Sequence, residues 1–259
     1  MTPVLPDRSY FVCATPRSGS TVLCQSLRAT GVAGRPEEYF ERLSHSGLPR
    51  EPREYFEGTA DPGVLALLPP TRSGDPTASE LDRELPRYLE EGTTPNGVFG
   101  AKLMWTYFGD LLARLGTTPD GAAVEALAAR FGRLSWIHVT RADKVAQAVS
   151  LWRAVQTRAW SASDRPEADP VYDARGIAHL RDRLVGQDAA WRDWFGAKGL
   201  RPLVVEYEDF VADHTATLRG VLAHLGLEVE RIPDPPMDRQ GDARSDRWVA
   251  RFNEEKELV

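Results

Sequence analysis

Cysteine is scarce in this chain, and the long apolar runs of membrane-spanning helices are missing from it. Cys13 and Cys24 are the only cysteines among 259 residues, and without a nearby cluster of cysteine and histidine a zinc site is not expected. We interpret both as buried, reduced thiols. No run approaches the length of a membrane span, and the first residues lack a basic region followed by an apolar one. These absences predict a soluble, cytoplasmic protein.

A surplus of basic charge is missing as well. The chain carries 38 acidic and 32 basic side chains, a net charge of -6, which argues against general binding to nucleic acid. Apolar residues make up 42% of the chain. This content is sufficient for the core of one α/β domain or of two small ones.

Short apolar runs alternate with longer segments of helical periodicity. Strands are predicted at 10–14, 96–105, 134–140 and 203–205, and helices at 20–30, 81–91, 108–116, 120–132, 143–160, 175–198 and 214–225. The stretch 59–79, rich in proline, glycine, serine and aspartate, is predicted to be a mobile surface excursion around a short apolar turn at 64–68. The stretch 161–173 is predicted to be a polar linker. The alternation predicts the α/β class, with a central, mostly parallel sheet flanked by helices.

The segment after the first predicted strand has the composition of an anion-binding loop. Arg17-Ser18-Gly19-Ser20-Thr21 stands where a helix begins. A guanidinium can bind two oxygens at once, glycine permits close approach to the backbone, and the N-terminus of a helix favours an anion. The segment also fits a surface turn before a helix with an ordinary serine or threonine cap. It is not a Walker A motif, because the lysine of that motif is missing.

Two further positions place polar side chains at or near predicted strands. Lys102 lies within an apolar strand, where it is either a cation that faces the anion site or a side chain that reaches out to solvent. Arg141 follows the third predicted strand, and Ser150 lies on the next helix. These two residues form a second candidate anion site. The alternative is an arginine paired with an acid and a serine that faces solvent.

Several of these motifs together resemble one family. The loop 15–21 (Thr-Pro-Arg-Ser-Gly-Ser-Thr) resembles the phosphosulfate-binding loop of sulfotransferases that use 3′-phosphoadenosine 5′-phosphosulfate (PAPS), and Arg141 with Ser150 resembles their 3′-phosphate pair. Further segments are similar to the mycobacterial trehalose 2-sulfotransferase family: 26–34, 94–98, 102–105, 147–150, 152–158 and 244–246. The resemblance covers nearly the whole chain. It implies a single sulfotransferase domain, 1–259, with a P-loop-like fold.

The resemblance implies transfer of a sulfuryl group from PAPS to a sugar hydroxyl, with trehalose or a related glycoside or glycolipid as the acceptor. It implies that Arg17 stabilises the departing phosphate and that Glu38 is the base that takes the proton of the acceptor. Glu37 is the neighbouring rival, and both glutamates also fit a solvated acidic pair. His138 is another conceivable base, although a histidine within a strand is more often a hydrogen-bonded core residue.

The remaining implied contacts fall into two sets. The donor set consists of the loop, the 3′-phosphate pair and two C-terminal arginines: Arg17, Ser18, Gly19, Ser20, Thr21, Arg141, Ser150, Arg239 and Arg244. Those C-terminal arginines also fit an exposed face. The acceptor set is Pro16, Arg35, Glu38 and Lys102. The resemblance also implies a homodimer, and no metal is expected.

The chain departs from the family pattern at two acceptor positions. The family has glutamine where this chain has Pro16 and glutamate where it has Arg35. Replacing an acid by an arginine exchanges a group that accepts hydrogen bonds for one that donates them. The acceptor could therefore be another glycoside, a glycolipid or a hydroxylated natural product.

Two other functions compete with sulfuryl transfer. A kinase that uses ATP is disfavoured, because the Walker lysine and an evident aspartate for Mg²⁺ are missing. A non-catalytic nucleotide-binding protein would need no base. The presence of Glu38 together with Arg17, Arg141 and Ser150 disfavours that alternative.

Overall fold

A parallel sheet is the centre of the fold. The computed structural model describes residues 5–43, 48, 50–72, 81–161, 164–236 and 243–257. The chain divides into two compact units. The first consists of Met1–Pro49, Pro76–Ala142 and Gln187–Met237, and the second of Arg50–Asp75, Asp143–Gly186 and Asp238–Val259.

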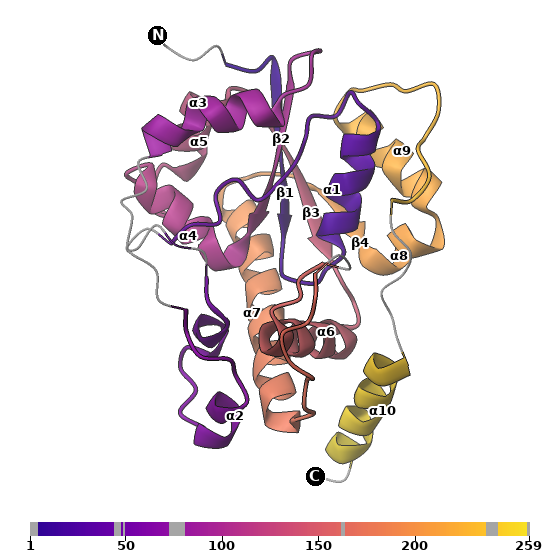
Figure 1. The fold of residues 1–259 in the computed structure, drawn as a ribbon. Coiled ribbons are helices and arrows are strands. Elements are labelled where there is room, and N and C mark those ends of the chain that lie inside the picture. Colours follow the sequence, from indigo (N-terminus) through magenta and orange to yellow (C-terminus); the bar gives the residue numbers. More distant parts are fainter. Residues whose placement is uncertain are drawn as a thin grey trace. The chain divides into compact units, whose positions relative to one another are not determined.

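The sheet lies in the first unit and has four strands within the described ranges, in the order β2-β1-β3-β4 (Figure 1). They are β1 (Arg8–Ala14), β2 (Val98–Met104), β3 (Leu134–Thr140) and β4 (Leu203–Glu206), each parallel to its neighbours. Every residue of β2 is buried, and because successive side chains point to opposite faces, both faces of this strand are covered. The predicted fold class and the four predicted strands are confirmed.

Helices of the first unit bury apolar residues on the sheet. They are α1 (Ser20–Ala29), α3 (Leu81–Gly92), α4 (Trp105–Arg114), α5 (Ala123–Phe131), α8 (Tyr207–Ala212) and α9 (His214–His224). In α1, Leu23 and Leu27 stand one turn apart and are fully buried, as the helical period requires. The ring of Phe11 on β1 packs edge-on against Phe131 of α5, with centroids 5.2 Å apart. The alternating apolar runs of the sequence thus form one core around the sheet.

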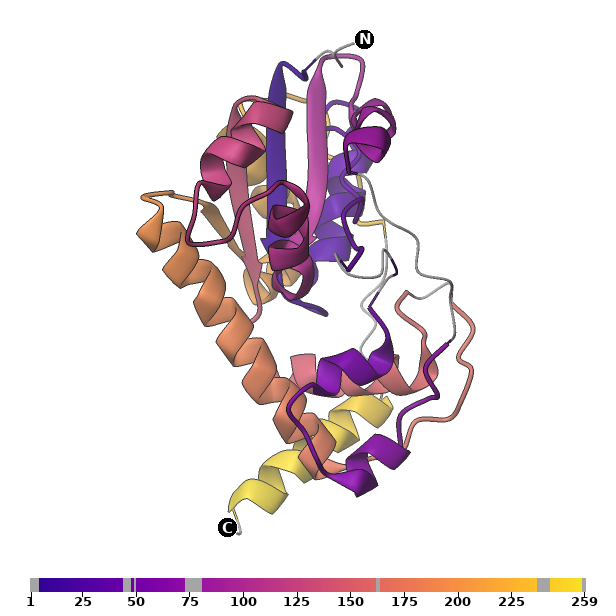
Figure 2. The same ribbon diagram turned by 90° about the vertical axis from the view of Figure 1, so that its left-hand side faces the viewer.

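The long helix α7 (Ala174–Ala197) is continuous (Figure 2). Its residues up to Gly186 belong to the second unit, and those from Gln187 belong to the first. Within the first unit, Trp191 donates a hydrogen bond of 2.9 Å from its Nε1 to the carbonyl oxygen of Ala14. This bond fixes the end of β1 directly before the predicted anion-binding loop.

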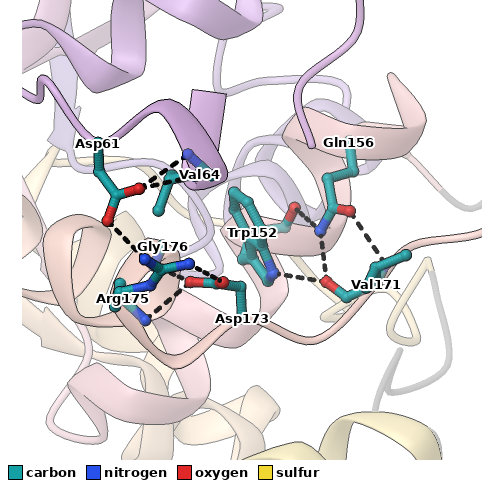
Figure 3. Close-up of polar contacts among 9 residues, drawn as sticks. Asp61, Val64, Trp152, Gln156, Val171, Asp173, Arg175 and Gly176 are labelled. Carbon is teal, nitrogen blue, oxygen red and sulfur yellow. Dashed lines mark hydrogen bonds and ion pairs between the residues drawn. The ribbon is translucent and has the colours of Figure 1, made fainter. Parts of the chain in front are cut away.

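The second unit has its own core around Trp152, which is fully buried. Its elements are a 3₁₀ helix (Pro52–Phe56), α2 (Pro62–Ala66), α6 (Lys144–Thr157), the first half of α7 and α10 (Ala243–Glu257). The backbone of Val171 forms hydrogen bonds with two side chains of α6 (Figure 3). Its carbonyl oxygen accepts hydrogen bonds from Trp152 Nε1 at 2.9 Å and Gln156 Nε2 at 3.0 Å. Its amide donates to Gln156 Oε1 at 3.0 Å.

Among the described residues, four helices have no helical counterpart in the prediction: the 3₁₀ helix, α2, α8 and α10. The short apolar turn predicted at 64–68 overlaps α2, which begins at Pro62 with the Asp61 side chain accepting hydrogen bonds from two amides. Residues 73–79 of the predicted excursion lie outside the described part. Asp61 also pairs with Arg175 at 2.8 Å (Figure 3). The predicted helix 143–160 ends earlier, at Thr157, because Arg158 adopts a left-handed conformation with φ 53°.

Two further predictions concern the cysteines and the membrane. Cys13 and Cys24 are free and buried, which confirms their interpretation, and burial raises the pKa of Cys24 to about 12. Of the helices in the described ranges, none combines the length and the apolar character that crossing a membrane requires.

Candidate functional site

The loop between β1 and α1 has a backbone suited to binding an anion. Arg17 has φ 62° and Gly19 has φ 90°, both in the left-handed region. Gly19 is the N-cap of α1, and a glycine supplies no capping oxygen to the first amides of the helix. Those amides and the helix dipole favour an anion at this point. The alternative of an ordinary serine or threonine cap is wrong.

Gly19 is required here for a second reason. A Cβ atom at this position would lie 2.4 Å from Cδ2 of Tyr207, far inside van der Waals contact. Tyr207 begins α8, and its ring also lies under the guanidinium of Arg141, 4.5 Å from the ring centroid. Tyr207 therefore packs against both the loop and the first residue after β3.

Two side-chain polar atoms at this loop are buried without a hydrogen-bond partner in the described ranges. The Oγ atom of Ser18 is one, and Nε of Arg141 is another. Arg141 also donates from Nη1 to the carbonyl oxygen of Arg17 at 3.3 Å. Unsatisfied buried donors are costly. Together with the guanidinium of Arg141 they fit a ligand with anionic oxygens, such as a phosphate.

A second polar cluster surrounds Glu38. Its Oε1 pairs with Nζ of Lys102 at 2.6 Å, and that ammonium donates to Oγ1 of Thr21 at 3.0 Å. Oε2 of Glu38 accepts from the hydroxyl of Tyr107 at 3.2 Å. Lys102 is only 5% exposed, so its ammonium faces Glu38 and the start of α1 instead of reaching out to solvent.

Burial and charge together perturb the titration of this cluster. Burial alone would lower the pKa of Lys102, but the negative charge of Glu38 raises it above its usual value. Burial and the charge of Glu38 raise the pKa of Glu41 to about 7. The same two causes raise the pKa of Tyr107 well above its ordinary value. At neutral pH the lysine is therefore charged, and the phenol keeps its proton.

Glu37 points elsewhere. Its carboxylate forms an ion pair of 2.8 Å with Arg28, and about half of each side chain is exposed. Residue 37 forms a parallel bridge with Ala101 of β2, and neighbours in an extended segment point to opposite sides. The structure therefore brings Glu38, and not Glu37, to Lys102.

His138 and Arg35 have structural partners. His138 is buried, with Nε2 3.1 Å from Oδ1 of Asp188, in agreement with the hydrogen-bonded core interpretation. The guanidinium of Arg35 donates to the carbonyl oxygens of Glu91 and Thr93 at 3.2 and 3.1 Å, at the end of α3. Its predicted part in acceptor binding stays a prediction.

The remaining predicted site residues are distributed over both units. Pro16 is buried at the start of the loop. Ser150 lies on α6, and Arg244 on α10 forms an exposed ion pair of 2.7 Å with Asp169, both in the second unit. Arg239 lies outside the described residues.

Sequence reasoning missed Tyr107, Tyr207 and Glu41. Tyr107 and Glu41 stand in amphipathic or polar segments where nothing marks them, since only the tertiary fold brings them to Glu38. Tyr207 had one available signal: it is an aromatic residue two positions after the predicted strand 203–205. In the part of the chain that the structure describes, histidine, cysteine, aspartate and glutamate do not gather in a group able to hold a metal.

Comparison with known proteins gives one family and several relatives. The family model described as Stf0 sulphotransferase matches residues 9–255. A Trehalose 2-sulfotransferase of Mycobacterium tuberculosis is 40% identical over 254 residues, covering 96% of this chain and 95% of that protein. A Trehalose 2-sulfotransferase of Mycolicibacterium smegmatis is 39% identical over 254 residues, covering 94% of each chain.

Two solved structures are more distant. A sulfotransferase from Alicyclobacillus acidocaldarius is 14% identical with a TM-score of 0.48, covering 97% of this chain and 96% of that one. The sulfotransferase domain of the Synechococcus PCC 7002 olefin synthase is 17% identical with a TM-score of 0.45, covering 99% and 96%.

Proposed function

The chain belongs to the Stf0 sulphotransferase family, and we propose that it transfers a sulfuryl group from PAPS to the 2-hydroxyl of trehalose. The family match and the relatives confirm the predicted family and the predicted enzyme class. The observation that carries the choice of acceptor is the 40% identity to the trehalose enzyme of Mycobacterium tuberculosis over 96% of the chain. In this proposal residues 1–259 act as one sulfotransferase domain, as a cytoplasmic homodimer.

The donor is assigned to the loop and to three further positions. The backbone amides at the start of α1 and the unpartnered Ser18 hydroxyl support a phosphosulfate at the loop. Negative charge grows on the bridging oxygen as the bond to sulfur breaks, and Arg17 and these amides would stabilise it. The full donor set is Arg17, Ser18, Gly19, Ser20, Thr21, Arg141 and Ser150, with Arg239 and Arg244 on the nucleotide.

Glu38 is assigned as the base. The oxygen of the acceptor hydroxyl attacks sulfur, its proton passes to Glu38, and adenosine 3′,5′-bisphosphate leaves with the electron pair of the broken bond. The contact between Glu38 and Lys102, at 2.6 Å, supports this role, because it orients the carboxylate. The exposed pair of Glu37 with Arg28 supports the choice between the two glutamates.

A different hydroxylated acceptor is the second candidate. Proline at position 16 and arginine at position 35 replace the glutamine and glutamate of the family pattern. In addition, Arg35 is engaged at the end of α3. If these two positions line the acceptor site, a sugar meets fewer groups that accept hydrogen bonds. A glycolipid or another glycoside then becomes the better substrate.

Calorimetry tests the donor assignment. Wild type is titrated with adenosine 3′,5′-bisphosphate, ADP and 5′-AMP, and so are Arg141→Ala and the control Arg231→Ala, an arginine that is exposed. We expect binding that requires the 3′-phosphate, about 10- to 100-fold weaker in Arg141→Ala because a charge-assisted contact is lost, and unchanged in Arg231→Ala. Equal or tighter binding of ADP would favour the kinase alternative, and absence of nucleotide binding would refute the donor assignment.

A further inference from the structure

The hydroxyl of Tyr107 stands between the proposed base and a backbone carbonyl. It lies 3.2 Å from Oε2 of Glu38 and 3.1 Å from the carbonyl oxygen of Lys102. Tyr107 is buried on α4, so bulk water does not compete for this hydroxyl. A phenol carries one proton. It can therefore donate fully to only one of these two oxygens at a time.

The two oxygens of Glu38 have partners of different kinds. Oε1 pairs with the ammonium of Lys102 at 2.6 Å, and an ammonium only donates. Oε2 faces a hydroxyl, which can donate or accept. A proton that arrives on Oε2 can therefore be accommodated by Tyr107 if the phenol turns its own proton to the carbonyl of Lys102. The ammonium of Lys102 cannot accept a hydrogen bond, so it could not accommodate a proton on Oε1 in this way.

We propose that Tyr107 is a positioning residue that acts as a hydrogen-bond switch for Glu38. Before transfer, the phenol O–H donates to the carboxylate at Oε2. When Glu38 takes the proton of the acceptor, the phenol O–H turns to the carbonyl of Lys102, and the phenol oxygen accepts the new carboxyl O–H. One O–H bond breaks at the acceptor and one forms at Glu38, and the phenol keeps its proton throughout. The inference rests on the proposed role of Glu38.

The surroundings agree with reorientation rather than ionisation of the phenol. Burial and the charges of Glu38 and Glu41 raise the pKa of Tyr107 well above its ordinary value. The titratable groups around Glu38 come from every neighbouring element: Lys102 from β2, Tyr107 from α4, Glu41 from its own segment and Cys24 from α1. The pKa of Cys24 is raised to about 12 by burial, so this thiol stays neutral.

The kinetic test compares Tyr107→Phe with Tyr10→Phe. Tyr10 is also a buried phenol of the first unit, and it donates to the carbonyl oxygen of Ala33 at 2.5 Å. We expect Tyr107→Phe to lower kcat about tenfold and to move the acid limb of the kcat profile to higher pH, because the ionised base loses a donor. The KM for PAPS should stay the same. Tyr10→Phe should lower the Tm without moving the profile. An unmoved acid limb in Tyr107→Phe would overturn the inference.

A spectroscopic test does not depend on turnover. The chain has 7 tyrosines, and with ¹³C at Cζ the signal of Tyr107 is assigned by its loss in Tyr107→Phe. This signal should shift in Glu38→Gln and should not show the large change of phenol ionisation near neutral pH. An identical Tyr107 signal in wild type and Glu38→Gln would overturn the switch even if the enzyme transfers sulfuryl groups. If the Tyr107 signal shifts in Glu38→Gln but the wild-type protein transfers no sulfuryl group, the proposed function is refuted and the hydrogen-bond switch is not.

Discussion

Glu38 lies among residues whose charges depend on one another. Lys102, buried in a strand, is held in its charged form by the carboxylate 2.6 Å away. Breaking such a pair on one side leaves an uncompensated charge, which is far more costly than losing a surface ion pair. The charge of Glu38 also disfavours a second negative charge nearby. Together with burial, it raises the pKa of Glu41.

Glu41 should make the stability of the protein depend on pH. Its pKa is raised from 4.5 to about 7 by burial and the charge of Glu38. A carboxyl with a raised pKa in the folded state stabilises fully below its unfolded pKa, and this contribution is lost as the pH rises through about 7. Glu41→Gln removes the effect. We therefore expect the variant to exceed wild type in unfolding free energy by about 1–3 kcal/mol at pH 8, and by less at pH 5.

Urea unfolding at the two pH values measures this difference. Glu91→Gln is the matched control, because Glu91 is a half-exposed glutamate in a surface pair with Arg87. The control should change the unfolding free energy by less than about 1 kcal/mol at either pH. A wild type as stable as Glu41→Gln at pH 8 would contradict the burial of this carboxyl.

Individual site residues were predictable where they break a local pattern. Lys102 interrupts an apolar strand, and Arg17 and Gly19 stand between a strand and a helix, so each is conspicuous in the sequence. Tyr107 and Glu41 break no pattern. Their properties come from burial beside Glu38, which depends on contacts between segments 69 residues apart in the case of Tyr107.

At the scale of elements, one glutamine contributes two of the hydrogen bonds that attach the segment before α7 to α6. Gln156 exchanges two hydrogen bonds of 3.0 Å with the backbone of Val171 (Figure 3). Removing the amide leaves the backbone N–H of Val171 without this partner. The segment from Arg158 to Asp173 should then open more often.

Gln156→Ala should therefore lower the unfolding free energy by about 1–3 kcal/mol and accelerate proteolytic cleavage between residues 158 and 173. Limited proteolysis with mass spectrometry locates the cleavage. Gln25→Ala, the same change on α1, should leave the cleavage rate in this segment as in wild type. An unchanged rate in Gln156→Ala would mean that other contacts hold Val171.

Elements with long apolar runs or strong periodicity were predictable, and short capped ones were not. The strands follow directly from their apolar runs. In contrast, α2 has five residues and is secured by Asp61 and its pairing with Arg175, a contact between distant segments. On α10 the apolar positions are sparse: only Phe252 is fully buried, with Trp248 and Val249 partly so. Such a helix is specified by packing more than by its own pattern.

At the scale of the whole molecule, the family match spans both compact units, since it extends over residues 9–255. The parallel sheet, the loop after β1 and the Glu38 cluster all lie in the first unit. Ser150 and Arg244, which the proposal assigns to the donor, belong to the second unit. The proposed transfer of a sulfuryl group from PAPS to trehalose therefore concerns both units, and the complete chain is used to test it.

The most direct measurement is the product of the reaction. The complete protein is incubated with PAPS and trehalose, and mass spectrometry quantifies trehalose sulfate and adenosine 3′,5′-bisphosphate. We predict equal amounts of the two products, with the rate in Glu38→Gln reduced by a factor of about 10² or more. Parallel reactions with a glycolipid and with ATP identify a different acceptor or a different donor. Formation of trehalose phosphate from ATP, or no sulfated product with any acceptor, would contradict the account.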